Sequence, residues 1–205
     1  TQRRRQRQMC IRDSSSGKMG FAIAEEAASR GASVTLITGP VHLSTPKQVY
    51  RKDVVSAEEM KNAILHYFDD SDVLIMAAAV ADYKPKVVSD EKIKKKNAKL
   101  SLELVKTDDI LKEIVKNKKQ QFVVGFALET NNEQENAKQK LVHKNLDAIV
   151  LNSLNDTGAG FGHDTNKVTI ITANEETTYA LKSKKEVAVD TVSYTHLTLP
   201  TTLSV

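Results

Sequence analysis

The chain has 205 residues, of which 40% are hydrophobic and 27% charged, enough for one globular domain with a buried core. Its formal net charge is +4, yet residues 1–12 hold five arginines and no acidic residue. Without that +5 the remaining residues carry a net charge of −1, so the basic balance belongs to one end of the chain. A fold that binds nucleic acid through a basic face is therefore not indicated.

Neither membrane insertion nor secretion is indicated. The longest unbroken apolar run, residues 73–81, has nine residues, against roughly 20 for a helix that spans a bilayer. No signal-peptide pattern opens the sequence. The only cysteine, Cys10, cannot form a disulfide within the chain, and a reducing, cytoplasmic location is expected.

The two ends differ in composition from the middle and resemble translated sequencing-adapter sequence. All lysines lie after the arginine-rich start, and residues 193–205 contain no charged side chain. We therefore expect residues 1–13 and 193–205 to be non-native or disordered tails on either side of one domain at 14–192.

Apolar runs and helical patterns alternate along the first half of this domain. A helix with apolar side chains on one face is predicted before Gly31, which favours a helix end. Ser56 and Glu59 have the spacing of a capping box at the start of a second helix. The predicted elements are helix 17–30, strands 33–38 and 49–54, helix 57–69, strand 72–77 and a lysine-rich irregular stretch to residue 99.

The second half repeats the alternation. The predicted elements are strand 100–105, helix 108–117 capped by Thr107 or Asp108, strand 121–127, helix 132–145, strand 147–151, a polar loop at 152–166 and strand 167–172. Strands that alternate with helices predict crossover connections, hence an α/β fold with a Rossmann-like, doubly wound, mostly parallel sheet. Such a domain normally opens with a strand, so its first strand is expected to be missing from this chain.

Residues 14–20 (SSSGKMG) fall at the start of the first predicted helix. Exposed N–H groups and the positive end of the helix dipole favour an anion there, and glycine lets a phosphate approach closely. The spacing is neither a Walker A loop nor a G-x-G-x-x-G fingerprint, and helix capping by serine is the alternative interpretation. The candidate phosphate-binding residues are Ser15, Ser16, Gly17 and Gly20.

Two further segments have features of a nucleotide site. Residues 77–83 (AAAVADY) follow a predicted central strand, where small side chains leave room for a flat ligand and Asp82 supplies an acceptor. Plain packing with an N-capping aspartate is the alternative. Residues 84–99 carry seven lysines, which are typical of a solvated segment or of a flap that folds over a polyphosphate.

Lys140 and Lys144 lie four residues apart on one predicted helix face. Like charges at that spacing repel by a few tenths of a kcal/mol, and an anion held between them would reverse the penalty. A solvent-facing helix surface is the alternative. No Ser/His/Asp or Cys/His nucleophile set stands out, so the residues alone predict a phosphate- or nucleotide-binding α/β domain and no particular reaction.

Five sequence strings occur in an order that closely resembles the phosphopantothenate–cysteine ligase domain, the synthetase half of the bacterial bifunctional coenzyme A biosynthesis flavoprotein. They are SSGKMG (15–20), AAVADY (78–83), EKIKK (91–95), VVGFA with ETN (123–127 and 129–131) and KNLD (144–147). The resemblance extends from about residue 15 to residue 192.

This resemblance implies that CTP activates the carboxylate of 4′-phosphopantothenate, with release of pyrophosphate. The amine of cysteine would then attack the acyl-cytidylate and release CMP. The resemblance also implies Mg²⁺ with the triphosphate, a homodimer, and a parent protein fused to a flavin-dependent decarboxylase domain; it assigns no metal ligands. The flavin-binding half has no counterpart in this sequence, so we expect no flavin on the chain.

The resemblance also implies residue roles. Lys92 would be a flap lysine that stabilises negative charge as the carboxylate attacks the α-phosphate, which is catalysis by electrostatics and orientation without a protein nucleophile. The implied nucleotide contacts are Met76, Ala77, Ala78, Asp82, Lys92, Asp108, Asp109, Ile110, Leu111, Phe126, Lys140 and Lys144.

One departure from the family pattern bears on activity. The family has Asn-His ahead of its Ser-Ser-Gly-Lys, and the asparagine engages the acyl intermediate; here those positions hold Asp13 and Ser14. An aspartate would repel an anionic substrate and lacks the amide donor, a loss that costs about 10²–10³ in rate. We expect the chain as written to be weak or inactive, and its parent domain to be active.

Two other functions fit parts of the sequence. A Rossmann-type NAD(P)-dependent oxidoreductase would share the alternation and the A-A-V-A-D turn, but G-x-G-x-x-G and a Tyr-x-x-x-Lys pair are missing. A nucleic-acid-binding protein is suggested by the pI of about 9.0. Deletion of residues 1–12 would leave nucleic-acid affinity unchanged only if the fold itself binds.

Overall fold

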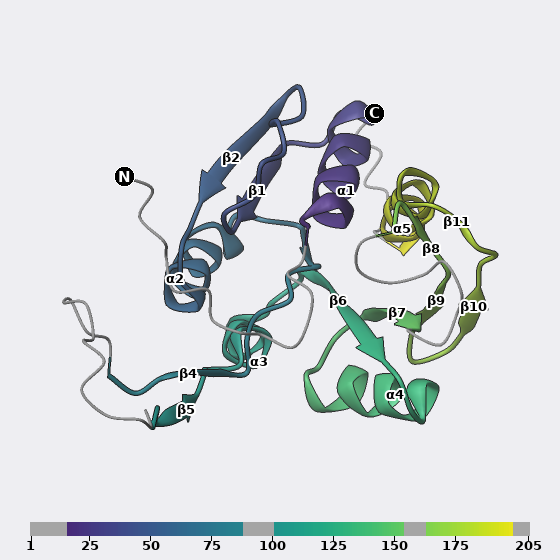
Figure 1. Ribbon diagram of the computed structural model, residues 1–205. Coiled ribbons are helices and arrows are strands. Elements are labelled where there is room, and N and C mark those ends of the chain that lie inside the picture. The colour runs from purple at the N-terminus through teal and green to yellow at the C-terminus, as the bar shows by residue number, and fades with distance from the viewer. Residues whose placement is uncertain (1–15, 88–100, 154–162, 199–205) are drawn as a thin grey trace.

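The computed structural model describes residues 16–87, 101–153 and 163–198 (Figure 1). Its helices are α1 (Lys18–Ser29), α2 (Ala57–Phe68), α3 (Ile110–Ile114), the 3₁₀ turn η1 (Val115–Asn117), α4 (Glu133–His143) and α5 (Lys184–Thr198). Its strands are β1 (Val34–Thr38), β2 (Val49–Asp53), β3 (Val73–Met76), β4 (Tyr83–Pro85), β5 (Leu104–Lys106), β6 (Phe122–Glu129), β7 (Ala148–Ser153), β8 (Thr165–Asn166), β9 (Val168–Ile171), β10 (Glu176–Thr178) and β11 (Lys182–Ser183).

A five-stranded sheet in the order β10-β9-β7-β6-β3 forms the centre of the molecule. Strands β3, β6 and β7 run parallel, and β9 and β10 add antiparallel strands at one side. Strands β1 and β2 form a separate parallel pair. The predicted α/β fold with a mostly parallel, doubly wound sheet is confirmed.

Strands β6 and β7 form the most deeply buried part of the sheet. Their successive side chains point to opposite faces, and those of Val123, Val124, Ile149 and Val150 are all buried. A strand that is buried on both faces has a continuous apolar sequence rather than an alternating one. The runs FVVGFAL and AIVL therefore place these two strands in the middle of a sheet that helices cover on both sides.

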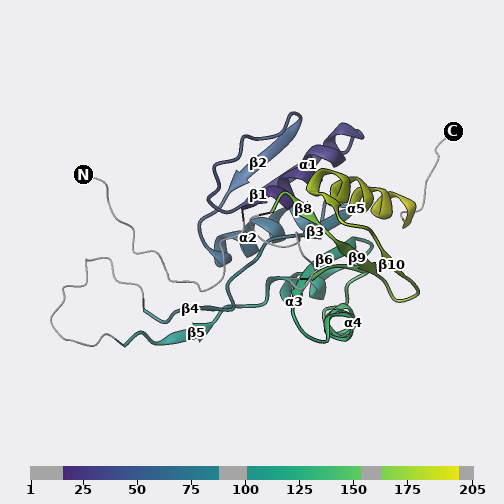
Figure 2. The same cartoon turned by 45° about the vertical axis from the view of Figure 1, so that its right-hand side comes forward.

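The helices form two layers, one on each face of the sheet (Figure 2). On one face, α2, α3 and α4 contribute side chains such as Phe68, Ile114 and Leu141 to a core that includes Val123 and Ile149. On the other face, α1 and α5 pack together and against the alternate side chains of the same strands. The arrangement is a three-layer α/β/α sandwich.

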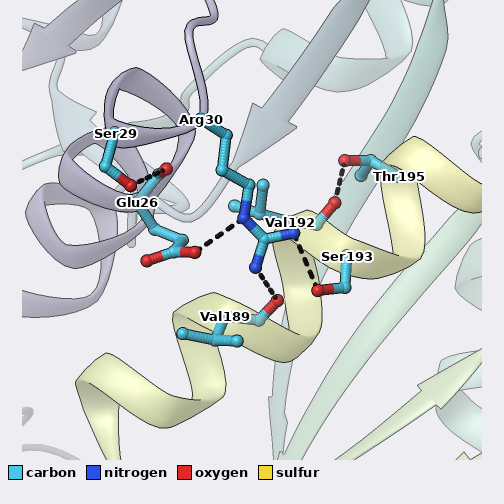
Figure 3. A network of polar contacts seen from close by, with 7 residues as sticks. All are labelled: Glu26, Ser29, Arg30, Val189, Val192, Ser193 and Thr195. Carbon is cyan, nitrogen blue, oxygen red and sulfur yellow. Dashed lines mark hydrogen bonds and ion pairs between the residues drawn. The ribbon is translucent and has the colours of Figure 1, made fainter.

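A polar network joins α1 to α5 (Figure 3). The guanidinium of Arg30 donates to Glu26 Oε1 at 2.6 Å, to Ser193 Oγ at 2.8 Å and to the carbonyl oxygen of Val189 at 3.3 Å. Helix α5 continues to residue 198, so the domain boundary predicted at residue 192 falls inside a helix. That helix, β10 and β11 were not among the predicted elements.

Most predicted helix ends in the first half are confirmed. Gly31 follows α1 with a φ of 89°, a left-handed conformation that favours glycine. At α2, Ser56 Oγ accepts a hydrogen bond from Glu59 N at 3.1 Å. The Glu59 carboxylate reaches back to Val55 N at 2.7 Å, one residue before the cap itself.

Three local predictions were wrong. The predicted helix 108–117 is a short α-helix followed by a 3₁₀ turn, and its cap is Asp109 rather than Thr107 or Asp108. Asp109 Oδ1 accepts from Lys112 N at 3.2 Å, whereas Asp108 pairs with Lys61. The strand predicted at 100–105 is β5 at 104–106, and the stretch predicted as irregular contains its antiparallel partner, β4.

No strand precedes α1 among the residues that the structure describes, and residues 1–15 lie outside them. The described helices include none that is long and apolar enough to cross a bilayer.

Replacement of Gly125 by alanine tests the tight packing of β6. An added Cβ would lie 2.7 Å from Leu146 Cδ1, in a buried position. Gly125→Ala is therefore expected to lower the free energy of unfolding by about 1–3 kcal/mol in urea titrations. Gly20→Ala is the matched control, because no described atom lies within 4 Å of its added Cβ and alanine favours a helix by about 0.5–1 kcal/mol. Equal stabilities of Gly125→Ala and the unmodified chain would contradict the packing argument.

Candidate functional site

The start of α1 lies at the carboxyl side of the central sheet. Met19, in the first turn of α1, packs against the same buried clusters as Ile75 of β3 and Phe126 of β6. Strands β3 and β6 run parallel with Met76 opposite Gly125, so the segment after Met76 leaves the sheet at the same edge. This is the edge at which doubly wound sheets bind their ligands.

Gly17 is the residue from which α1 begins. Its φ is 73°, and a Cβ at this position would lie 3.1 Å from Val41 Cγ1, so both conformation and space favour glycine. Ser16 Oγ accepts a hydrogen bond from Lys18 N at 3.5 Å. The first turn of α1 contains no acidic side chain, so the positive end of the helix dipole is not neutralised from within the helix.

A buried lysine lies close to this helix start. Lys184 begins α5, is only 9% exposed, and donates from Nζ to the carbonyl oxygen of His163 at 2.6 Å. Burial lowers the pKa of Lys184, and the nearby charge of Lys18 lowers it further, against the opposing effect of Asp164. Lys18 itself pairs with Asp164 at 2.6 Å. Two cationic side chains therefore lie near one helix N-terminus.

Two asparagines link this region to the end of β7. Asn166 Nδ2 lies 3.9 Å from Met19 Sδ, and Asn152 Nδ2 donates to Asn166 Oδ1 at 3.4 Å. The Asn152 Oδ1 atom is buried and has no hydrogen-bond partner among the described residues. A buried polar atom without a partner is costly and is common where a ligand or water binds.

Sequence reasoning missed Lys184 and Asn152. Asn152 was assigned to a polar loop, but it belongs to β7, near the carboxyl end of that strand. The rule that ligands bind at carboxyl ends of strands could have nominated it. The sequence around Lys184 contains no pattern that marks a binding residue, because Lys184 comes close to Lys18 only in the folded chain.

The predicted residues that follow β3 lie at this edge of the sheet. Met76 is the buried last residue of β3, Ala77 is partly exposed, and Ala78 and Asp82 are exposed. The carbonyl oxygen of Asp82 accepts from Thr107 N at 2.9 Å, which ties the segment to the chain before α3. The predicted catalytic residues Asp13 and Lys92, and Ser15 of the phosphate-binding set, lie outside the described residues.

The predicted contacts at residues 108–111 differ in what they can offer a ligand. Asp108 is exposed and pairs with Lys61 at 2.7 Å, while Asp109 caps α3. Ile110 and Leu111 are buried in the core, so only their backbone groups could face a nucleotide. Phe126 is partly buried against the α1 and α5 layer.

Lys140 and Lys144 have separate acidic partners. Lys140 pairs with Glu129 of β6, and Lys144 Nζ lies 2.9 Å from Asp109 Oδ2. The structure shows no carboxylate shared by the two lysines among the described side chains. Their role in nucleotide binding stays a prediction.

A hollow of about 900 Å³ opens where α4 begins, on the carboxyl side of β6 and β7. Hydroxyl, amide and charged side chains line it, among them Asn131, Glu133, Ser153, Lys167 and Thr178. Ser153 Oγ donates to Glu133 Oε1 at 2.6 Å across its wall. Within the described ranges no group of three or more His, Cys, Asp or Glu side chains could hold a metal ion.

Comparison with known proteins identifies the family. Residues 8–196 match the family described as the DNA/pantothenate metabolism flavoprotein C-terminal domain. The chain belongs to this family. The resemblance inferred from five short sequence strings is thereby confirmed.

Two curated relatives are about half identical to this chain over the aligned regions. The coenzyme A biosynthesis bifunctional protein CoaBC of Bacillus subtilis is 52% identical over 76% of the chain and 39% of its own length. A cysteine/cysteine sulfinic acid decarboxylase from an unknown prokaryotic organism is 51% identical over 89% of the chain and 52% of its own length. The chain therefore spans about half the length of the curated relatives it matches.

Solved structures share the fold. The crystal structure of the C-terminal domain of CoaBC is 40% identical with a TM-score of 0.75, covering 89% of this chain and 83% of that one. A DNA/pantothenate metabolism flavoprotein from Streptococcus pneumoniae has a TM-score of 0.75 at 22% identity, covering 89% of each chain, and shows the fold alone.

The cap of α3 gives a prediction for acid stability. Burial by itself raises the pKa of Asp109, but hydrogen bonds from the Lys144 ammonium and the Lys112 N–H outweigh it and hold the pKa below its usual range. The resulting stabilisation is present above the unfolded-state pKa and is lost as pH falls through the lower folded-state pKa.

Asp109→Asn keeps a good N-cap and removes the charge pair. Between about pH 5 and pH 2, its free energy of unfolding is expected to fall less steeply than that of the unmodified chain. Urea titrations at several pH values measure this. Asp70→Asn, which removes an exposed carboxylate before β3, is the control. Identical slopes for Asp109→Asn and the unmodified chain would contradict the assignment.

Proposed function

We propose that this domain joins 4′-phosphopantothenate to L-cysteine in a CTP-dependent reaction of coenzyme A biosynthesis. Membership of the family and the 52% identity to a protein named for coenzyme A biosynthesis support the general role. The observation that carries the proposal is the positive charge gathered at the start of α1, which we propose as the triphosphate site. There Gly17 starts the helix, and Lys18 and the buried Lys184 lie near it.

The site suits a triphosphate for electrostatic reasons. The helix dipole and two lysines concentrate positive charge, and Asp164 pairs with Lys18. Binding of a polyanion would relieve the mutual repulsion of Lys18 and Lys184. The small side chains of Ala77 and Ala78, next to the end of β3, leave room for a base or a substrate chain.

The chemistry requires no protein nucleophile. The substrate carboxylate attacks the α-phosphate of CTP, the bond to the β-phosphate breaks, and pyrophosphate leaves. The cysteine amine then attacks the acyl carbon, loses a proton, and CMP leaves. Preorganised positive charge stabilises the phosphate oxygens in the first step, and the fold holds the two reactants together.

Magnesium fits this site as part of the nucleotide complex. Mg²⁺ at nucleotide sites is held mainly by substrate phosphates and waters, with one or two carboxylates. The described side chains, which contain no cluster of three metal-ligating groups, suit that mode. The ion would neutralise charge on the triphosphate, and we assign no protein ligand to it.

The oligomeric state and the wider protein are also part of the proposal. We propose a homodimer and a parent protein in which this domain is fused to a flavin-dependent decarboxylase domain. The bifunctional names of the relatives, of which the chain spans about half, support the second point. The expectation that this chain carries no flavin stays a prediction.

Product release tests the reaction. The chain with phosphopantothenate, cysteine, Mg²⁺ and each nucleoside triphosphate in turn is expected to release CMP only slowly, and Asp13→Asn is expected to raise the rate about 10²–10³-fold. Asp70→Asn, which removes an exposed carboxylate that precedes β3, is the control. Absence of CMP release from Asp13→Asn with CTP would contradict the proposal.

The same assay separates the competing functions. Release of CO₂ from cysteine without phosphopantothenate would support decarboxylation, the activity in the name of one relative. Turnover of NAD(P)H would support the oxidoreductase alternative.

A pair of adjacent lysines tests the anion site. Lys184 is buried at the start of α5, whereas the side chain of Lys185 is 80% exposed. Lys184→Met is expected to weaken CTP binding about 10–100-fold, the loss of one charge-assisted hydrogen bond, while Lys185→Met changes it little. Titration calorimetry measures both affinities. An unchanged affinity of a folded Lys184→Met protein would place the triphosphate elsewhere.

A further inference from the structure

The connection between β1 and β2 runs through residues 39–48 and contains neither helix nor strand. Parallel neighbours are usually joined by a helix, so an irregular connection of this kind depends on other contacts for its position. Val41 and Leu43 are partly buried, whereas the residues before and after each of them are exposed. One side of the connection therefore faces the protein.

That side lies against the start of α1. A Cβ on Gly17 would lie 3.1 Å from Val41 Cγ1 and 3.6 Å from Leu43 Cδ1. The buried ring of Phe21, one turn into the helix, would lie 3.6 Å from the same Cβ. Phe21 N also donates to the carbonyl oxygen of Gly17 at 3.0 Å, which closes the first turn. Gly17 is thus bordered by the connection and by the Phe21 ring.

Arg51 of β2 contacts both of these neighbours of Gly17. Its Nη1 donates to the carbonyl oxygen of Leu43 at 2.7 Å. Its guanidinium carbon lies 5.4 Å from the centroid of the Phe21 ring, within the range of a cation–π contact. Its Nε and Nη2 donate to Asp53 Oδ1 at 2.9 and 2.7 Å. The planar fork of arginine allows these contacts to be made together.

The burial of Arg51 is unusual for its strand. Its side chain is only 18% exposed, whereas Tyr50 and Lys52 on either side of it are exposed. Removal of a charged group from water is costly unless its contacts offset the lost hydration. Support of β2 alone would account for the bonds to Leu43 and Asp53, but it does not account for the contact with α1.

We propose that Arg51 is a positioning residue for the start of α1. It holds residues 39–48 and the Phe21 ring beside Gly17, and thereby fixes the direction of the first N–H groups of the helix. This inference rests on the proposed function, in which the triphosphate binds at that helix start. Arg51 acts through its neighbours, and we assign it no contact with the nucleotide.

Amide hydrogen exchange in the full chain tests the positioning directly. Arg51→Gln removes both the charge and the fork, so the Phe21 amide is expected to exchange about tenfold faster or more. Amides in the last turn of α1 are the internal reference. Unchanged exchange of the Phe21 amide in a folded Arg51→Gln protein would overturn the proposal.

Titration calorimetry with CTP separates positioning from general stabilisation. A merely structural Arg51 would contribute to the free energy of unfolding and leave the affinity of the folded protein unchanged. Arg51→Gln is instead expected to bind CTP about three- to tenfold more weakly. Lys52→Gln is the matched control, because it removes one positive charge at the adjacent, exposed position and is expected to change the affinity little. Equal losses in the two variants would reduce the role of Arg51 to its charge and would refute the proposal.

Asp53→Ala is a second variant that keeps the arginine. Loss of an acidic side chain by itself strengthens the binding of an anion. If Asp53 fixes Arg51, its removal instead weakens CTP binding and speeds exchange of the Phe21 amide. Stronger CTP binding by Asp53→Ala would contradict the proposal. Failure of the unmodified chain to bind CTP would contradict the proposed function alone, and exchange at Phe21 would then decide the role of Arg51.

Discussion

The parallel pairing of β6 with β7 is the constraint on which the rest of the structure depends. Both strands are apolar along their length, so both faces of the sheet must be covered. Parallel neighbours in turn require crossover connections, and here α4 connects β6 to β7. One consequence is that the carboxyl ends of the strands open at a single edge, where α1 begins and the chain leaves β3.

At that edge of the sheet positive side-chain charge is only partly compensated, which favours binding of an anion. A protein interior disfavours a buried charge, and it disfavours two like charges near each other even more. Lys184 is buried and also lies near the charge of Lys18, and Asp164 opposes these effects on its pKa. Arrangements that cost stability without a ligand are frequent at functional sites, because the ligand removes the cost.

Local features of the sequence predicted the elements whose ends are fixed locally. Gly31 and Ser56 mark helix boundaries through their own backbone or side chain, and both were identified. The choice between Asp108 and Asp109 as a cap depends on Lys61, which comes from another helix. Strand β4 was missed because its partner β5 lies beyond a long lysine-rich segment.

The same distinction applies to the candidate site. Ser16, Gly17 and Ala77 were recognisable because a glycine-rich helix start and a small-residue strand end are local patterns. Lys184 and Asn152 were not, since their significance arises only when three distant segments meet. The family likewise was indicated by the order of several weak motifs and by none of them singly.

The Arg30 fork has a mechanical consequence (Figure 3). Helix α1 begins at the proposed anion site and ends at a guanidinium clamped to α5 through Val189 and Ser193. The orientation of α1 at this site is thus stabilised at the opposite end of the helix, by residues of α5. A chain shortened to residue 192 would lose Ser193 and with it one of the two hydrogen bonds from Arg30 to α5. Such a change would alter the orientation of α1 at the proposed anion site without removing any residue of that site.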